Sequence, residues 1–156
     1  MITFEKATPA DAAILTEVQT RCFDHDTRRY LNQPSGGPPG YDSVGWQIQH
    51  MQRGMYYKIL SDGQIIGGII VFRLGKGHYE LGRIYLDPDY QDQGIGTQAM
   101  GFIESQFPDA VRWTLDTPVW ATRNHHFYEK LGYVKVREDD AYGERLCFYE
   151  KRWSGG

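Results

Sequence analysis

The residues with the clearest chemical potential are the two glycines of the segment Gln91-Asp92-Gln93-Gly94-Ile95-Gly96-Thr97. Glycines at this spacing let the backbone turn sharply, so that several N–H groups face one direction. A helix that begins here adds its own unpaired N–H groups and the positive end of its dipole. Such a loop binds a phosphate without any basic side chain. A glycine-rich turn that only caps a helix fits the same residues, so this segment alone leaves both interpretations open.

The same glycines also match the G-x-G-x-x-A fingerprint of dinucleotide-binding folds, over Gly94 to Ala99. Asp116 ends the next strand-like segment, where such a fold places the carboxylate that binds a ribose. Against this hypothesis, seven residues separate Leu86 from Gly94, whereas the fingerprint follows its strand directly. A Walker phosphate loop is excluded because no lysine follows Gly96. A dinucleotide-dependent oxidoreductase therefore remains only the weaker alternative.

The composition is typical of one globular domain. The chain has 156 residues, of which 40% are hydrophobic and 24% are charged, and its net charge is −3. We therefore predict a single domain over residues 1–156, with a frayed tail at 153–156. The charge balance lacks the basic surplus that attracts nucleic acid or anionic membranes. No aliphatic stretch is long enough to span a bilayer and no signal pattern opens the chain, so we expect a cytoplasmic protein without nucleic-acid or membrane partners.

Neither the cysteines nor the histidines form a metal-binding pattern. Cys22 and Cys147 are far apart in the sequence, so we expect reduced, buried thiols and no metal. His125 and His126 are adjacent, and on a helix adjacent side chains point about 100° apart, which rules out an i, i+4 pair of ligands.

Periodicity, caps and breakers predict a mixed sheet with helices on its faces. The helix that Thr8 caps is expected to end near Phe23. Residues 24–41 lack apolar periodicity and should form a long loop, either a lid on the substrate side or a solvent-exposed excursion. In chain order the predicted elements are a strand at 2–5, helices at 8–23 and 43–54, strands at 55–60, 64–74 and 78–86, a helix at 95–107, a strand at 111–116, a helix at 122–131, and strands at 133–137 and 146–150.

Two motifs carry a resemblance to a known family. Glu80 to Pro88, followed by Gln91 to Gly96, resembles the acetyl-CoA-binding core of the GNAT acetyltransferase superfamily. That core has Gln or Arg, two free positions, Gly, one free position, and Gly or Ala. Downstream, Asn124 to Tyr133 is similar to the second signature of the family, an Asn followed by a Phe-Tyr-Glu-Lys-Leu-Gly-aromatic run. The predicted order of elements matches the family over essentially the whole chain.

The resemblance implies an α/β (α+β) fold, a mixed and mostly antiparallel sheet of about seven strands flanked by about four helices, with the fourth and fifth strands splayed apart. It also implies acetyl-CoA as the cosubstrate, with its pyrophosphate on the glycine loop and its pantetheine arm along the backbone of Ile84 and Leu86. Asn124 matches a family position that touches the pantetheine, and Lys130 matches one that touches the phosphates. The implied cofactor-binding residues are Ile84, Tyr85, Leu86, Gln91, Asp92, Gln93, Gly94, Ile95, Gly96, Thr97, Asn124, Tyr128 and Lys130.

The resemblance also implies the catalytic residues. Tyr128 occupies the place of the general acid, and a phenol with a pKa of about 10 can donate a proton at neutral pH; the alternative is a tyrosine that only packs in the core. Glu80 is the candidate general base and shares a face with Gly82 and Ile84 if no bulge intervenes. The alternative for Glu80 is a solvated carboxylate or a structural partner of Arg83.

We therefore predict an N-acetyltransferase that moves an acetyl group from acetyl-CoA to a primary amine by direct attack in a ternary complex. A backbone N–H near Tyr85 or Leu86 is the implied oxyanion donor. The alternative from another class is a non-catalytic CoA-binding regulatory module on the same fold. The acceptor is expected to be a small-molecule or peptide amine, and the protein is expected to act alone or as a homodimer. The aromatic candidates for the acceptor pocket are Tyr30, Tyr41, Trp46 and Trp120.

Overall fold

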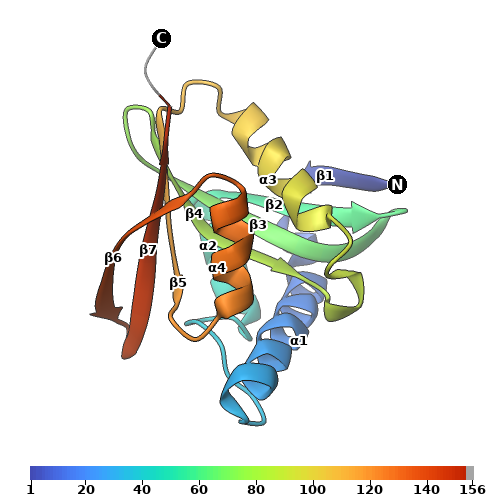
Figure 1. Ribbon diagram of the computed structural model, residues 1–156. Coiled ribbons are helices and arrows are strands. Elements are labelled where there is room, and N and C mark those ends of the chain that lie inside the picture. Colours follow the sequence, from blue (N-terminus) through green and yellow to red (C-terminus); the bar gives the residue numbers. More distant parts are fainter. Residues whose placement is uncertain (154–156) are drawn as a thin grey trace.

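Seven strands and four helices make up residues 1–153, the part of the chain that the computed structural model describes (Figure 1). Residues 154–156, the end of the expected tail, lie outside the described residues. The backbone N–H of Trp153 donates to the Val111 carbonyl at 2.9 Å. The elements are β1 (Ile2–Lys6), η1 (Pro9–Asp11), α1 (Ala12–Leu31), α2 (Val44–Arg53), β2 (Met55–Ser61), β3 (Gln64–Gly75), β4 (His78–Leu86), η2 (Pro88–Tyr90), α3 (Ile95–Gln106), β5 (Arg112–Pro118), α4 (Thr122–Lys130), β6 (Val134–Ala141) and β7 (Glu144–Arg152), where η marks a 3₁₀ turn.

The strands form one sheet in the order β1-β2-β3-β4-β5-β7-β6. Every neighbouring pair runs antiparallel except β4 and β5, which are parallel. The expected mixed and mostly antiparallel sheet, with its discontinuity between the fourth and fifth strands, is confirmed. A doubly wound dinucleotide fold would need a mostly parallel sheet with alternating helices, so this topology removes that alternative.

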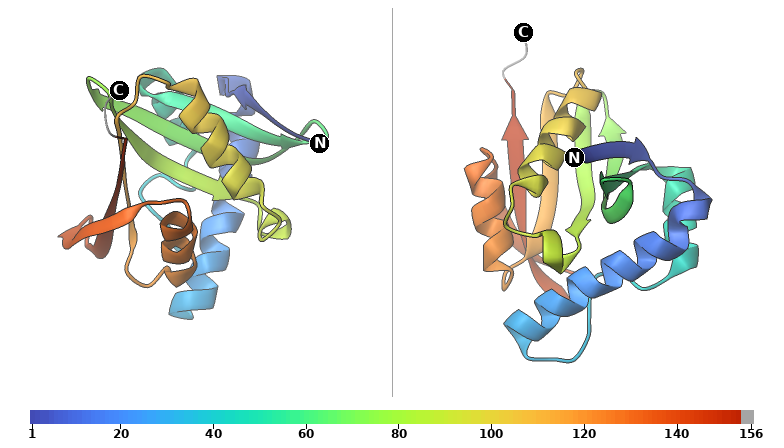
Figure 2. Two further views of the ribbon diagram at one scale, coloured as in Figure 1. Left: turned by 45° about the horizontal axis from the view of Figure 1, so that its top comes forward. Right: turned by 90° about the vertical axis from the view of Figure 1, so that its right-hand side faces the viewer.

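Helices cover both faces of the sheet, which creates two cores (Figure 2). On one face lie α1 and α2, where Leu15 and Val18 pack against Ile70 and Tyr85. On the other face lie α3 and α4, and Ile103 of α3 is fully buried there. Burial of these apolar surfaces is the main force that holds the layers together. Within residues 1–153, no helix combines the length and the apolarity that crossing a bilayer requires.

The first helix is longer than its apolar periodicity predicts, since α1 continues past Phe23 to Leu31. Polar contacts with the following loop help to stabilise its last turns. The buried hydroxyl of Thr27 donates to the Gly36 carbonyl at 2.7 Å, and the Asp24 carboxylate accepts from the Gly36 N–H at 3.0 Å. The long loop is therefore shorter than expected, and its first half is held against α1.

A buried polar chain joins α2 to the sheet. Ser43 caps α2, since its hydroxyl accepts from the N–H of Trp46 at 3.1 Å. The side-chain oxygen of buried Gln47 accepts from the Tyr56 hydroxyl at 2.6 Å, and the hydroxyls of Tyr56 and Tyr85 lie 2.5 Å apart. Burial raises the pKa of Tyr56 to about 12. Because these buried polar groups have partners, they fix the end of β4 relative to α2.

Candidate active site at the fork between β4 and β5

The strands β4 and β5 hydrogen-bond to each other only near their beginnings. Their parallel register has three pairs and ends where Glu80 lies beside Thr114. Beyond that point β4 continues to Leu86 and β5 to Pro118, and the strands diverge. Among the described residues, the backbone of β4 from Leu81 onward has no partner strand on the β5 side. An extended ligand can pair with such an open edge.

The glycine loop forms the N-terminus of α3, as the sequence predicts. Gly94 is the cap residue in the left-handed conformation, with φ of 81°, and the Gln98 N–H donates to its carbonyl at 3.2 Å. Within residues 1–153 the backbone N–H groups of Gln93 to Thr97 have no hydrogen-bond partner, so they are available to a phosphate. A Cβ at Gly96 would lie 3.1 Å from the Phe127 ring of α4, so any larger residue would crowd that ring.

An arginine with no place in the predicted site links this loop to α4. Arg123 donates to the side-chain oxygen of Gln91 at 2.5 Å and to the Asp92 carboxylate at 3.2 Å. Gln91 in turn donates to the Leu86 carbonyl at 3.1 Å. These bonds join the start of the loop to the end of β4 and to the first turn of α4. The only sequence signal for Arg123 is a positive charge directly before Asn124 of the second motif.

Tyr128 and Asn124 bring α4 to the fork. Tyr128 is 6% exposed, and no group among the described residues hydrogen-bonds to its hydroxyl. Burial, with smaller contributions from the Asp116 carboxylate of β5 and the Cys22 thiol of α1, raises the pKa of Tyr128 above that of an exposed phenol. Charged or ionisable groups on both β5 and α1 thus act electrostatically on this hydroxyl. The Asn124 amide donates to the buried Thr117 hydroxyl of β5 at 3.1 Å.

The other predicted residues differ in what they offer a ligand. Lys130 is exposed in the last turn of α4 and forms no ion pair within residues 1–153. The side chain of Tyr85 is buried with its hydroxyl against Tyr56, so only its backbone is open to a ligand. Ile84 and Leu86 pack partly buried side chains against the core under α3. These three residues of β4 therefore present backbone groups at the fork.

A β-bulge in β4 changes which side chains share a face with Glu80. Leu81 and Arg83 pair with consecutive residues of β3, which leaves Gly82 as an extra residue. A bulge inverts the alternation of side chains beyond it. Ile84 therefore turns to the core under α3, while Glu80 and Arg83 lie on the face of α1 and α2. The expected common face of Glu80 and Ile84 required a strand without a bulge and does not occur.

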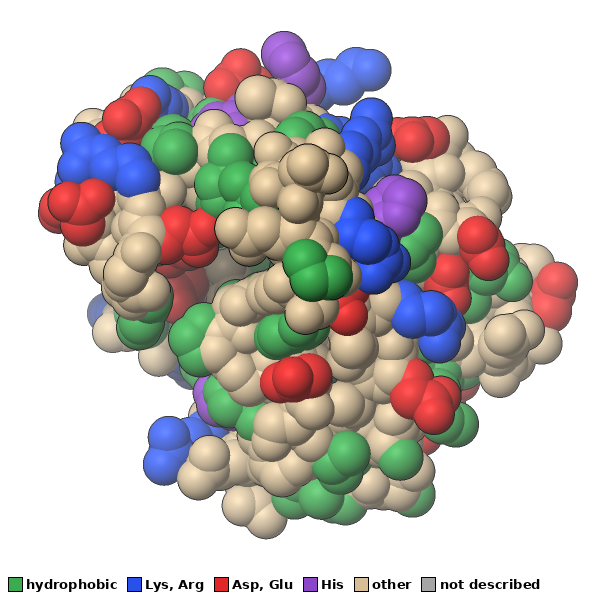
Figure 3. Space-filling model, turned by 90° about the horizontal axis from the view of Figure 1, so that it is seen from below, with side chains coloured by type: hydrophobic (Ala, Val, Ile, Leu, Met, Phe, Trp, Pro, Cys, Tyr) green, Lys and Arg blue, Asp and Glu red, His purple; other side chains and the backbone are tan. Residues whose placement is uncertain are grey.

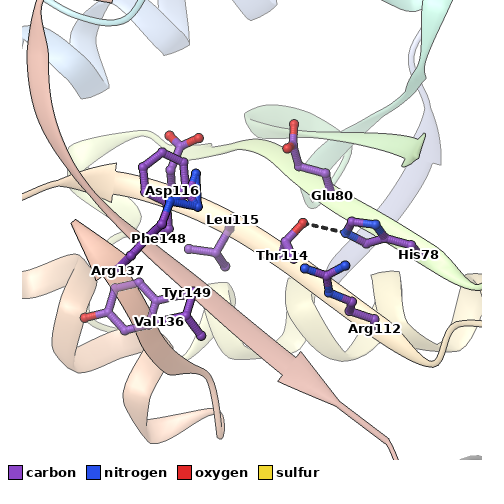
Figure 4. Close-up of a pocket in the computed structure, with 10 residues that line it drawn as sticks. All are labelled: His78, Glu80, Arg112, Thr114, Leu115, Asp116, Val136, Arg137, Phe148 and Tyr149. Atoms are coloured by element: carbon purple, nitrogen blue, oxygen red, sulfur yellow. Dashed lines mark hydrogen bonds between the residues drawn. The ribbon is translucent and has the colours of Figure 1, made fainter. Parts of the chain in front are cut away.

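A cavity of about 210 Å³ lies at the base of the fork, and Glu80 and Asp116 line it from neighbouring strands (Figure 4). Figure 4 shows both carboxylates on the same side of the sheet. Within residues 1–153 neither carboxylate forms an ion pair or a hydrogen bond. From β6 and β7, the cavity is bordered by Val136, Arg137 and Phe148. Seen from below, the molecule has a hollow with acidic side chains on its wall (Figure 3).

The two carboxylates hold protons more tightly than exposed ones. Burial, and in second place repulsion from Asp116, raises the pKa of Glu80 above its ordinary value. The pKa of Asp116 is also raised, because loss of solvent outweighs the opposing fields of Arg83 and Arg137. Carboxylates with raised pKa values are typical of sites that exchange protons. In the sequence, the position of Asp116 near the end of a strand suggested only a ribose ligand.

Arg83 does not form an ion pair with Glu80. Its guanidinium donates to the side-chain oxygen of Gln19 at 3.0 Å and to the Pro39 carbonyl at 3.1 Å. It also lies over the Trp46 ring, 4.2 Å from the centroid. Burial lowers the pKa of Arg83 to about 10, so it stays charged at neutral pH. Arg83 thus ties α1, α2 and the loop between them to β4, and it leaves the Glu80 carboxylate unpaired.

The aromatic candidates for the acceptor pocket come from different elements of the fold. The rings of Tyr30 and Trp120 are 5.7 Å apart and join α1 to the turn before α4. Tyr41 bonds back to α1 through its hydroxyl, and Trp46 belongs to α2. Cys22 and Cys147 are buried free thiols, as predicted. In the described part of the chain no three His, Cys, Asp or Glu side chains gather as metal ligands.

Solved structures with this fold include known acetyltransferases. The PaiA N-acetyltransferase of Thermoplasma acidophilum, in complex with coenzyme A, superposes with a TM-score of 0.79 at 19% identity, covering 98% of this chain and 99% of that one. The ribosomal-protein-S18-alanine N-acetyltransferase of Escherichia coli superposes with a TM-score of 0.78 at 16% identity, covering 100% and 96%. At these identities the likeness establishes the fold.

Sequence comparison establishes the family. The uncharacterized protein YrkN of Bacillus subtilis (strain 168) is 42% identical over 79 residues, which are 49% of this chain and 43% of that protein. The chain therefore spans less than half of the length of this relative. The model of the acetyltransferase (GNAT) family matches residues 14–133, a stretch that contains both motifs and the fork. The chain belongs to the GNAT acetyltransferase family.

Proposed function

We propose that this protein is an N-acetyltransferase that transfers the acetyl group of acetyl-CoA to a primary amine. One observation carries the proposal: the Tyr128 hydroxyl has no partner within residues 1–153 and is influenced by the charge of Asp116, which lines a cavity at the fork together with the unpaired carboxylate of Glu80. Acyl transfer to an amine uses a proton acceptor for the amine and a proton donor for the thiolate, and these side chains can supply both. Membership of the acetyltransferase family supports this assignment.

The open backbone groups fit acetyl-CoA, which supplies the thioester. The N–H groups of Gln93 to Thr97 would hold the pyrophosphate, because they have no partners in residues 1–153 and lie at a helix N-terminus. The edge of β4 from Ile84 to Leu86 would pair with the pantetheine arm. Asn124 borders the same opening. Arg123, bonded to the loop through Gln91, would add a positive charge beside the phosphates, together with Lys130.

The side chains at the fork divide the proton transfers between them. Glu80 accepts a proton from the acceptor ammonium, directly or through water, so that a neutral amine attacks the thioester carbonyl. A backbone N–H near Tyr85 or Leu86 stabilises the oxyanion. Tyr128 donates a proton to the departing thiolate and takes up the second proton that the attacking nitrogen loses as the amide forms; its raised pKa keeps it protonated at neutral pH. Because no protein group competes for the Tyr128 hydroxyl within the described residues, it is free for this bond.

Calorimetry with CoA and a thiol-release assay with acetyl-CoA test the proposal together. A panel of small amines and short peptides serves as acceptors. We expect CoA to bind and thiol to be released only when a suitable amine is present. Binding of CoA without release for any amine would favour the alternative of a non-catalytic CoA-binding module. No binding of CoA would contradict both assignments.

The proposal also includes the cellular location and the oligomeric state of the protein. A cytoplasmic location is supported by two buried free cysteines, because reduced thiols persist in that compartment. Fractionation of cells that contain the tagged protein tests the location. A homodimer stays a prediction, and sedimentation equilibrium of the purified protein decides it.

A further inference from the structure

Arg137 enters the cavity because β6 contains a bulge. Lys135 and Arg137 pair with consecutive residues of β7, Tyr149 and Phe148, which leaves Val136 as an extra residue. In a regular strand Val136 would pair with Phe148, and Arg137 would lie on the opposite face. The bulge therefore turns a guanidinium toward the cavity that Glu80 also lines.

The guanidinium of Arg137 has no anionic partner within residues 1–153. It lies over the Phe148 ring, 3.8 Å from the centroid, and this contact leaves its N–H donors free. Arg112, the other arginine of the cavity, is already paired with Glu150. The same cavity thus contains two unpaired carboxylates and one unpaired guanidinium.

We propose that the cavity binds a zwitterionic acceptor of the amino-acid class, with its ammonium between Glu80 and Asp116 and its carboxylate on Arg137. The guanidinium fork matches a carboxylate in shape and charge, and a bound carboxylate would neutralise the unpaired guanidinium of the cavity. This inference rests on the proposed acetyl transfer and names its substrate class. Arg137 selects the acceptor and takes no part in the proton transfers.

The size and charges of the cavity favour this acceptor over its rivals. At about 210 Å³ the cavity is smaller than the sites that hold drug-sized ligands, which start near 300 Å³. A small molecule therefore fits it better than a folded protein surface. A diamine would satisfy both carboxylates but would bring a second positive charge close to Arg137, which is unfavourable.

Matched ligands that differ by one carboxylate test the inference in the CoA-saturated protein. Leucine is compared with 3-methylbutylamine, and lysine with 1,5-diaminopentane, by calorimetry. We expect each amino acid to bind about tenfold or more tightly than its decarboxylated partner, because a charge-assisted hydrogen bond is lost in the amine. In Arg137→Gln this preference should disappear, and in Arg137→Lys it should return in part. The control variant Arg145→Gln replaces an exposed arginine of β7 outside the cavity and should keep the preference for the amino acid.

Several results would overturn the inference. These are tighter binding of the amine or the diamine, a preference that Arg137→Gln leaves unchanged, or no binding of any amino acid in the panel. A parallel thiol-release assay separates this failure from failure of the proposed function. Turnover of amines without a carboxylate preference would leave the acetyltransferase assignment standing and reject the substrate class. A protein that does not bind CoA would reject the proposed function itself.

Discussion

Glu80 of β4 and Asp116 of β5 line one cavity at the base of the fork, and neither carboxylate has an ion-pair partner within residues 1–153. Both sit on the face of α1 and α2, and the bulge at Gly82 lies two residues after Glu80 on the chain. Burial raises the pKa of both carboxylates, and repulsion from Asp116 adds to the effect at Glu80, so Glu80 is suited to take up a proton. This relationship determines most of the behaviour expected of the protein.

Asp116 is expected to set the pH at which the base becomes active. Glu80 must be deprotonated to accept a proton, so kcat/KM should rise as the pH rises through its raised pKa. Asp116→Asn removes the repulsion, while the effect of burial stays, and should move this acidic limb to lower pH. A pH–rate profile measures the shift. Asp139→Asn, which replaces an exposed carboxylate of β6, is the control. If the acidic limb of the pH–rate profile stays at the same pH in Asp116→Asn, the two carboxylates do not interact.

The same substitution should make the folded protein more stable at neutral pH. A carboxyl whose pKa is higher in the folded than in the unfolded chain holds its proton more tightly when folded, so its ionisation destabilises the fold. This penalty is present above the folded pKa and decreases as the pH falls through it. Asp116→Asn should therefore raise Tm at pH 7.5, and the gain should shrink toward pH 4. Calorimetric melting checks this, and a gain of equal size at both pH values would contradict it.

Tyr128→Phe should lower kcat and leave CoA binding nearly unchanged. The hydroxyl has no partner among the described residues, so its removal should not destabilise the fold. We expect a loss of about 100-fold, at the lower end for general acids, because a thiolate is a moderate leaving group. Tyr133→Phe is a matched control, since it removes another buried and unpartnered hydroxyl. Equal effects of the two substitutions on kcat would argue against an acid role for Tyr128.

Gly96→Val should abolish binding of CoA. The added side chain would meet the Phe127 ring and should shift the loop from the conformation that presents its N–H groups. Losing two charge-assisted hydrogen bonds to phosphate weakens binding by about 100-fold or more. Gly101→Ala in the same helix has no heavy atom within 4 Å of the new Cβ. It should bind CoA normally and stabilise α3 by about 0.5–1 kcal/mol, as calorimetry and thermal melting can verify. Normal CoA binding by Gly96→Val would place the phosphates elsewhere.

The order of elements and the cofactor loop follow from local sequence features. Caps, breakers and periodicity act over a few residues, and so does the rule that Gly94 and Gly96 open a helix at the loop. The end of α1 could not be predicted in this way. Its last turns depend on Thr27 and Asp24 meeting Gly36 across the following loop, a contact that leaves no apolar period.

The cavity was harder to predict because bulges arise from pairing between distant segments. Gly82 is an extra residue only relative to β3, and Val136 only relative to β7. A period-2 pattern therefore assigned the wrong face beyond Glu80 and gave no reason to examine Arg137. Asp116 and Arg123 likewise acquire their roles from neighbours that folding brings to them.

The most direct test of the central claim is thiol release from acetyl-CoA by Glu80→Gln, measured beside the wild-type protein with a competent amine. Glutamine keeps the size of the side chain and removes its ability to accept the proton. We expect an unchanged Kd for CoA and a fall in kcat/KM of about 100-fold. This loss should become smaller at high pH, where more of the amine is already neutral. Wild-type turnover by Glu80→Gln at neutral pH would contradict the account, because the fork would then not be where the acceptor loses its proton.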